Sequence, residues 1–447
     1  MRGAKRIGWG GVALVLLLLA TACGAPGRAT ETPPADTPTA TEATATATAN
    51  GAAPAVASPP SAQQAAGPPA GAAQATAPPA PQPLTPAQLQ KFRPNELGEI
   101  PVLMYHTFLP GVSEADDVWN RTPDEFRGDL QYLYTHGYYL TSMHDFVTGD
   151  IDIPAGKTPV ILTFDDGAES QFRYLVQPDG SKIIDPNCAL GILEAMYKEH
   201  PDFGRAGVFY ILPLSPFAND DDKNHQRPYA KEKLEFLLAH GYELGNHTVH
   251  HPDLSKMTNP QIMQEIAGGT DGIHSYVPTA PVETIALPFG MYPPHGDTTL
   301  LEGFDLDGRH YGFKAAMMVG AEPAPSPFDK RRDLLWTPRI RGSGDQLVKW
   351  FGDYFEKYPS LRYISDGDPA TVTIPENLPS RLATNLNPAS LGNRKLVRYT
   401  LAAQGPAGPT GQRTPGTTET VVRHAVLPTP DGMGTRGRTR RAAILRI

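Results

Sequence analysis

The chain has 447 residues, enough for one large domain or two of ordinary size. Acidic residues outnumber basic ones by 47 to 39, which gives a formal net charge of −8. This balance argues against nucleic acid as the main partner, because proteins that bind it usually present a basic patch.

The N-terminal segment has the pattern of an export signal. Three basic residues, Arg2, Lys5 and Arg6, precede an apolar run. That run, residues 11–22, is too short to span a membrane comfortably. Small residues then lead to Cys23, as in a bacterial lipoprotein signal whose cysteine carries the lipid anchor. A plain secretory signal of residues 1–22 is the alternative, and either predicts an exported protein.

Low-complexity segments flank the middle of the chain. Residues 23–85 are mainly Ala, Thr, Pro and Gln, and they cannot bury enough apolar surface to offset the entropy of ordering. We expect them to form a disordered tether. Residues 404–447 predict a basic tail that either contacts anionic lipid or wall polymer or is simply unstructured. Cys188 is the only cysteine beyond the signal, so we expect a buried thiol and no intrachain disulfide.

The middle alternates apolar strands with amphipathic helices. Thr122, Pro123 and Glu125 form a helix-capping pattern. The alternation predicts a parallel α/β sheet or barrel, with active residues at the carboxyl ends of strands. We assign 86–360 to this domain and expect 361–403 to add closing strands or a small lobe. In chain order we expect a strand at 100–105, a helix at 122–137, a strand at 158–164, a helix at 189–200, a strand at 206–212, a helix at 231–241, strands at 283–287, 313–319 and 334–340, and a helix at 345–358.

The stretch TFDDG, residues 163–167, places two carboxylates where an apolar strand ends. Two carboxylates in one site repel each other unless a cation or a proton separates them, so we expect metal ligands elsewhere in the chain. His247 and His251 are four residues apart, a spacing that we interpret as one side of a helical turn. One carboxylate and two imidazoles make a three-ligand metal site with open positions for water and substrate.

These segments resemble the motifs of a known family. LTFDDG, HTVHHP and LPFG are similar, in order, to the first three motifs of the polysaccharide deacetylases (NodB homology, carbohydrate esterase family 4). The resemblance covers about residues 99–345. It implies a distorted (β/α) barrel and a metal-dependent hydrolase. Its expected substrate is an N-acetylglucosamine-containing extracellular or cell-wall polysaccharide. We expect no nucleic acid partner, on the charge balance given above, and no obligate protein partner.

The resemblance implies a role for each residue of the first two motifs. Asp165 matches the catalytic base. Asp166, His247 and His251 match the ligands of one divalent metal, for which we expect Zn, with Co, Ni, Mn or Fe as alternatives. Such a metal lowers the pKa of a bound water, which then attacks the N-acetyl carbonyl.

The resemblance also implies a proton donor and an oxyanion site. The usual donor is a histidine in a late motif, and no such motif follows residue 340. A circularly permuted branch, which acts on poly-N-acetylglucosamine, carries that histidine near the front, and His106 in LMYH fits this placement. A core histidine is the alternative for His106. Thr248 matches the hydroxyl residue that braces the histidine loop, and Phe289, after Pro288, matches the residue whose backbone N–H binds the oxyanion.

One position departs from the family pattern. Ala286 stands where family members often have an arginine that orients the catalytic aspartate. Arg339 or Arg341 could supply a substitute charge, or both could be ordinary surface residues. Trp336 and Tyr292 could line a sugar cleft or pack in the core.

Two other classes of function stay open at this stage. The chain could be a catalytically inactive glycan-binding lipoprotein of the same fold, a reading that Ala286 motivates. Two histidines and one carboxylate also describe the iron site of non-haem oxygenases. The four-residue histidine spacing, 247 to 251, differs from the close His–Asp pair expected in that class.

Overall fold

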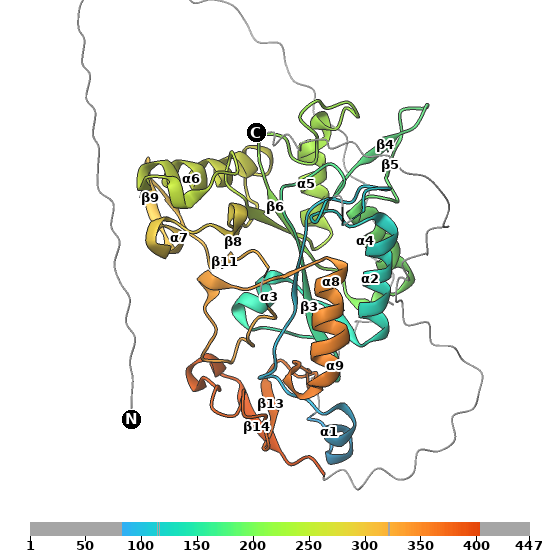
Figure 1. Ribbon diagram of the computed structural model, residues 1–447, viewed down its shortest axis with the longest axis vertical. Helices are drawn as coiled ribbons and strands as arrows, with labels where there is room; N and C mark the ends of the chain where they lie inside the picture. Colours follow the sequence, from blue (N-terminus) through green and yellow to red (C-terminus); the bar gives the residue numbers. More distant parts are fainter. Residues whose placement is uncertain (1–82, 114, 116, 321, 403–447) are drawn as a thin grey trace, which may run out of the picture. The chain divides into compact units, whose positions relative to one another are not determined.

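The computed structural model describes residues 83–402 except 114, 116 and 321 (Figure 1). The expected signal peptide, its lipidated Cys23, most of the tether and the basic tail lie outside these residues. Within the described part, none of the helices combines the length and apolar character needed to cross a bilayer.

Strands and helices alternate along the described chain. The helices are α1 (Pro86–Phe92), α2 (Pro123–Thr135), α3 (Met143–Thr148), α4 (Ala189–Glu199), α5 (Ala230–Ala239), α6 (Asn259–Tyr276), α7 (Thr299–Glu302), α8 (Gly344–Leu347) and α9 (Phe355–Lys357). The strands are β1 (Val102–Tyr105), β2 (Tyr138–Leu140), β3 (Thr158–Phe164), β4 (Tyr174–Val176), β5 (Lys182–Ile184), β6 (Val208–Ile211), β7 (Glu243–Asn246), β8 (Thr284–Ala286), β9 (Phe304–Leu306), β10 (Arg309–Tyr311), β11 (Ala315–Met317), β12 (Ile340–Arg341), β13 (Thr371–Pro375) and β14 (Lys395–Tyr399).

Eight parallel strands form the central sheet. Their order is β11-β8-β7-β6-β3-β1-β12, and β2 pairs with the start of β3. The segment that leads into β12 also bridges to β11, through Met317 and Thr337. The sheet therefore curls into a distorted (β/α) barrel, as the sequence predicted, and the carboxyl ends of its strands share one rim.

Alternate residues of β1 and β3 belong to two different hydrophobic clusters. Val102, Ile161 and Tyr210 belong to a cluster inside the curled sheet. Leu103 and Leu162, the next residues along β1 and β3, belong to an outer cluster that includes side chains of α2, α4 and α5. All seven residues of β3 are buried, as expected for a strand covered on both faces. On another side, α6 packs near β8 and β11 (Figure 1).

Most of the predicted elements are present, and the structure differs from the prediction mainly at 334–340 and 345–358. The Thr122 capping box on α2 is formed as predicted. The expected strand at 334–340 is wrong: Leu334–Trp336 is a 3-10 turn capped by Asp333, and only Ile340–Arg341 is strand. Pro338 has no N–H to donate to a ladder, which disfavours a longer strand there. The expected late helix at 345–358 is divided into α8, a π-helical stretch and α9.

Residues 361–402, for which the sequence predicted closing strands or a small lobe, contribute two strands that lie outside the barrel sheet. Strands β13 and β14 pair in parallel with each other. The segment just before β1 bridges to this region, Asn95 with Ile364 and Glu99 with Arg362. In Figure 1 β13 and β14 lie beside α1, and Gln90 of α1 donates to the carbonyl oxygen of Thr400 at 2.9 Å. The last described residues therefore pack against the first described residues of the chain.

The insertion after the first motif folds as a hairpin. Strands β4 and β5 pair antiparallel, outside the barrel sheet. Cys188, which follows the hairpin, is buried and free, as predicted. Its Sγ accepts the N–H of Gly191 at 3.4 Å, so the thiol caps the start of α4.

A buried lysine makes the stability of this fold depend on pH. Lys233 of α5 is fully buried, and its Nζ donates to the carbonyl oxygen of Phe217 at 2.9 Å. Burial lowers its pKa to about 7, against the opposing charge of Glu169. The unfolded chain binds this proton more tightly than the folded chain does. The free energy of unfolding should therefore rise as the pH increases from about 7 towards 10.

We expect Lys233→Met to raise the melting temperature at pH 7 and to raise it much less at pH 10. The substitution keeps the length of the side chain and removes a buried charge, whose cost near pH 7 is roughly 4 kcal/mol at about 1.4 kcal/mol per pKa unit. Losing the hydrogen bond to Phe217 costs only about 1 kcal/mol. Thermal melts at both pH values measure this, with the exposed Lys231→Met as control. An equal gain at the two pH values would contradict the assignment.

Candidate active site

Two neighbouring carboxylates lie where β3 ends at the barrel rim. The N–H of Asp165 donates to the carbonyl oxygen of Tyr105 at 2.9 Å, which extends the ladder with β1 by one residue. Asp166 and Gly167 then adopt left-handed backbone angles, with φ of 77° and 61°. This conformation is costly for a residue with a side chain and is typical of functional sites. It ends the strand between the two carboxylates and turns the chain at Gly167.

The histidine segment is a loop, so the predicted helical turn is wrong. Thr248 and His251 have φ of 66° and 54°, which no α-helix accommodates. Two hydrogen bonds hold the loop: Asn246 Oδ1 accepts the N–H of Thr248 at 2.7 Å, and Thr248 Oγ1 accepts the N–H of His251 at 3.1 Å. Thr248 therefore occupies the bracing position that the resemblance implied. His250 lies outside the cluster, and its Nδ1 is 2.8 Å from Oε1 of Glu265.

The structure brings Asp166, His247 and His251 together. Oδ1 of Asp166 is 3.1 Å from Nε2 of His247 and 3.6 Å from Nε2 of His251. The three ligand atoms all lie within 4.8 Å of one another. Nδ1 of His247 is 2.8 Å from the carbonyl oxygen of Ala286, which can only accept, so Nδ1 carries the proton. Nε2, which faces Oδ1 of Asp166, is then the nitrogen through which a neutral His247 would bind a metal. This donor set fits a single divalent cation.

Charges in the cluster favour the metal-binding forms of Asp166 and His251. Burial lowers the pKa of His247, but its hydrogen bond to Asp166 and the charges of Asp165 and Asp166 outweigh burial and raise it. Burial opposes the charge on Asp166, but the hydrogen bond with His247 and the nearby histidines outweigh it and hold the pKa of Asp166 well below its usual value. Burial and the neighbouring His247 lower the pKa of His251. A metal needs an ionised carboxylate and neutral imidazoles, so Asp166 and His251 are in the required forms near neutral pH.

A buried arginine holds Asp165. Arg339 is 0% exposed, and its two terminal nitrogens donate to the two oxygens of Asp165, both at 2.7 Å. Its Nε donates to the carbonyl oxygen of Met318 at 2.6 Å. Burial alone would raise the pKa of Asp165, but the charge and hydrogen bonds of Arg339 hold it below the usual value. The reading of Arg339 as a surface residue is therefore wrong. Arg341 instead donates to Ser343 Oγ at 3.2 Å.

His106 also lies near Asp165. Its Nε2 is 3.9 Å from Oδ2 of Asp165, and its side chain is 15% exposed. Burial lowers its pKa, although Asp165 opposes the shift. Its ring lies 4.6 Å from the ring of Trp119. The implied link to the permuted branch stays a prediction.

Gln171 is a site residue that the sequence reasoning missed. Its Nε2 donates to the carbonyl oxygen of His106 at 2.7 Å and to that of Asp165. The side chain is fully buried and joins the ends of β1 and β3. No motif marks this glutamine; its position six residues after Asp165 was the only available signal.

The third motif faces the histidine loop. Phe289 has φ of 56°, and its ring lies 4.5 Å from the ring of His251. Among the described residues no hydrogen-bond acceptor takes the Phe289 N–H, which therefore stays available to a ligand. Pro288 before it is buried. Farther along, Tyr292 and Trp336 stack on each other at 3.6 Å, with Tyr292 buried.

Part of the chain matches a known family. Residues 210–300 match the family model described as polysaccharide deacetylase. This segment contains His247, His251 and the LPFG stretch. Asp165 and Asp166 precede it, and the fold joins them to the histidines.

Several named relatives are similar to this chain. YxkH of Bacillus subtilis (strain 168), whose name assigns it to the polysaccharide deacetylases, is 22% identical over 260 residues, 58% of this chain and 76% of YxkH. The chitooligosaccharide deacetylase of Bradyrhizobium sp. (strain ANU 289) is 24% identical over 144 residues, 32% of this chain and 50% of that protein. The solved structure of the Streptococcus pyogenes deacetylase PplD in complex with acetate aligns with a TM-score of 0.41 and 23% identity, covering 56% of this chain and 97% of that one.

Proposed function

This chain belongs to the polysaccharide deacetylase family, and we propose that it is a metal-dependent hydrolase that removes N-acetyl groups from an N-acetylglucosamine-containing polysaccharide. One observation carries the proposal. Asp165, held by Arg339, lies in sequence beside the Asp166–His247–His251 cluster and in space beside His106. A protein that only gripped glycan would need no buried, oriented carboxylate next to a metal-binding triad.

Each site residue has a separate role in the proposed reaction. A divalent metal held by Asp166, His247 and His251 would supply Lewis-acid activation of water and of the N-acetyl carbonyl. Asp165, kept ionised by Arg339, accepts a proton from the attacking water. The Phe289 N–H stabilises negative charge on the carbonyl oxygen, a type of contact worth about 3–4 kcal/mol in the transition state. His106 protonates the leaving amine, and acetate and a free amine result.

Zinc suits the proposed ligand set best, because one carboxylate and two imidazoles are typical zinc donors. We also propose an exported protein that is held at the outer face of the membrane through lipid on Cys23. Support for this comes from the sequence: the basic start, the apolar run 11–22 and the small residues before the cysteine. The long Ala/Thr/Pro segment would then keep the catalytic domain away from the membrane.

We expect the purified, metal-loaded protein to release acetate from at least one of three polymers: chitooligosaccharide, peptidoglycan or poly-N-acetylglucosamine. Chelation followed by dialysis should remove the activity, and added Zn²⁺ should restore it. Enzymatic acetate determination measures the product. If none of the three polymers yields acetate and glycan binding is intact, the catalytically inactive binding protein replaces this proposal.

A further inference from the structure

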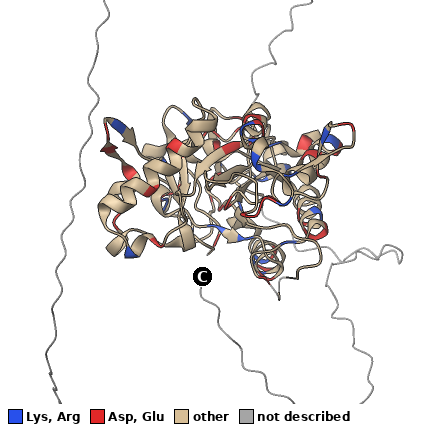
Figure 2. Cartoon of the chain, turned by 90° about the horizontal axis from the view of Figure 1, so that it is seen from above, with Lys and Arg blue, Asp and Glu red and all other residues tan. Residues whose placement is uncertain are grey.

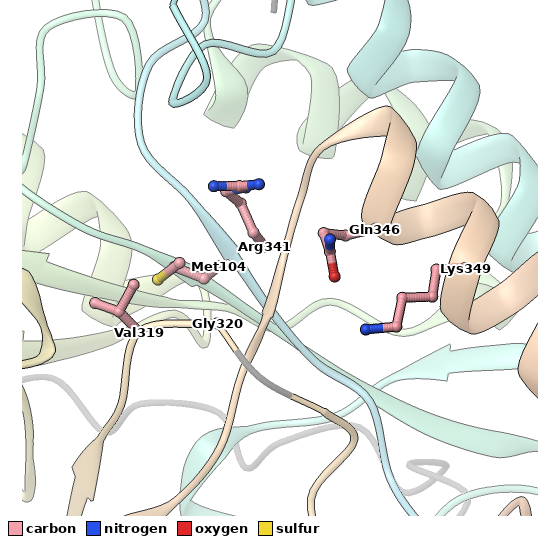
Figure 3. Close-up of a pocket in the computed structure, with 6 residues that line it drawn as sticks. All are labelled: Met104, Val319, Gly320, Arg341, Gln346 and Lys349. Atoms are coloured by element: carbon pink, nitrogen blue, oxygen red, sulfur yellow. The ribbon is translucent and has the colours of Figure 1, made fainter. Parts of the chain in front are cut away.

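A cavity opens against strands β1 and β12, which contribute Met104 and Arg341 to its lining. Its volume is about 260 Å³, and Figure 3 shows the six residues that line it: Met104, Val319, Gly320, Arg341, Gln346 and Lys349. Met104 pairs with Arg341 in the ladder between β1 and β12 and precedes His106 by two residues. The cavity therefore lies near the rim of the barrel at which β1 ends and His106 follows.

Trp119 links this cavity to the proposed active site. Its ring is 4.6 Å from the ring of His106 and 5.5 Å from the guanidinium of Arg341. The indole is 39% exposed, although it is a large apolar group. Exposed aromatic rings of this kind suit the apolar faces of sugars, so one sugar chain could contact both places through the same indole.

The polar side chains of the cavity leave positive charge without a close partner. The nearest carboxylate oxygen to Arg341 is Oδ2 of Asp345, at 3.9 Å on a side chain that is 63% exposed. Lys349 makes no ion pair with any described residue, and its Nζ lies 4.4 Å from the ring centroid of Trp350. Gln346 donates its amide to Asp345 at 2.9 Å. Two cations thus line a small hollow on a chain whose net charge is −8.

This concentration of charge is local. Figure 2 shows basic and acidic residues interspersed over the described ribbon. General steering of anions to the protein is therefore weak, and the two cations act at short range. A guanidinium presents a planar fork of donors to a carboxylate or phosphate, and an ammonium adds a point charge.

We propose that this cavity, defined by Arg341, Gln346 and Lys349 and called here the cationic pocket, binds an anionic substituent of the polysaccharide whose N-acetyl group reaches Asp165. The inference rests on the proposed function and names its substrate class. The preferred substrate is an acid-bearing N-acetylated glycan, with a carboxylate or a phosphate on a sugar near the one that is deacetylated. Neutral chitin-like chains leave the pocket without a ligand.

Kinetics on matched substrates test the proposal. The carboxylate arm uses peptidoglycan glycan strands, which carry a lactyl carboxylate, and the same strands with that acid reduced to the alcohol. The phosphate arm uses a glycan of equal length with a phosphate ester, and chitooligosaccharide is the neutral reference. We expect Arg341→Gln and Lys349→Gln each to raise KM at least ten-fold on one acidic substrate with kcat nearly unchanged. KM on the reduced strand and on chitooligosaccharide should stay within two-fold.

Two further variants control this experiment. Lys357→Gln removes one charge from an exposed lysine that, like Lys349, lies over the ring of the next aromatic residue, and it should leave every KM unchanged. Arg341→Lys keeps the charge and should recover part of the lost affinity. Circular-dichroism melts identify any variant that fails to fold. The arm that responds decides between carboxylate and phosphate.

Direct binding separates this inference from the proposed function. Calorimetric titration of the metal-free protein with the acidic and reduced strands needs no turnover. If the wild type releases no acetate but binds the acidic strand at least ten-fold tighter, and Arg341→Gln removes the preference, the pocket is confirmed and the proposed reaction fails. Equal binding of acidic and neutral strands, or an undiminished preference in Arg341→Gln and Lys349→Gln, overturns the pocket.

Discussion

Asp165→Asn is expected to lower acetate release by about a thousand-fold while metal binding is retained. A positioned general base contributes about 10²- to 10⁴-fold to a reaction of this type, and asparagine cannot accept the proton. The metal should be retained because Asp165 is not one of the proposed ligands. Both of its carboxylate oxygens instead accept hydrogen bonds from the terminal nitrogens of Arg339. Metal content by atomic emission and initial rates of acetate release measure the two effects on the same preparation.

His247→Ala provides the contrasting result. It removes a ligand whose orientation depends on the carbonyl oxygen of Ala286, so metal content should fall to background and activity should disappear with it. His250→Ala is the matched control, because that side chain is two-thirds exposed and paired with Glu265. Retained activity in Asp165→Asn would refute the base assignment. Retained metal in His247→Ala would refute the ligand set.

Arg339→Met is expected to destabilise the fold by about 3–5 kcal/mol, because it leaves the buried carboxylate of Asp165 without a partner. Burial then dominates, so the pKa of Asp165 should rise above its usual value instead of lying below it. The base then becomes protonated at a higher pH, so the acid limb of the pH–rate profile should shift to higher pH. Denaturant unfolding and a pH profile of kcat/KM measure the two consequences.

A double variant separates charge from packing. Arg339→Met with Asp165→Asn contains no isolated buried charge, so much of the lost stability should return, and the two effects should be non-additive. Arg341→Met is the matched control for stability, because Arg341 is partly exposed and does not touch Asp165; its effect should stay within about 0.5 kcal/mol. Equal stability of Arg339→Met and Arg341→Met would show that Arg339 carries no such role.

The core strands could be predicted because their signal is local. The run at 158–164 is apolar throughout, and a strand buried on both faces needs that composition. The strand expected at 334–340 failed because a capped turn at Asp333 and the missing N–H of Pro338 outweigh apolar character. Sequence reasoning could also place Asp165 and Asp166 at the end of a strand.

The details of the site depend on tertiary contacts that no local pattern encodes. The spacing of His247 and His251 suits a helix and a loop equally, and the left-handed backbone at Thr248 decides for the loop. Arg339 and Arg341 are two residues apart, so strand periodicity gives them the same face and cannot tell which one reaches Asp165. The two arginines differ in burial, and their burial follows from the pairing of β12 with β1.

The arginine that orients the proposed base lies immediately before the last strand of the barrel sheet. The proposed metal ligands come from segments that follow β3 and β7, whereas Arg339 immediately precedes β12. A chain that ended before Arg339 would contain Asp165 and the three proposed metal ligands but not the side chain that holds Asp165. Under the proposed function, the base is therefore oriented only when this last part of the domain is in place.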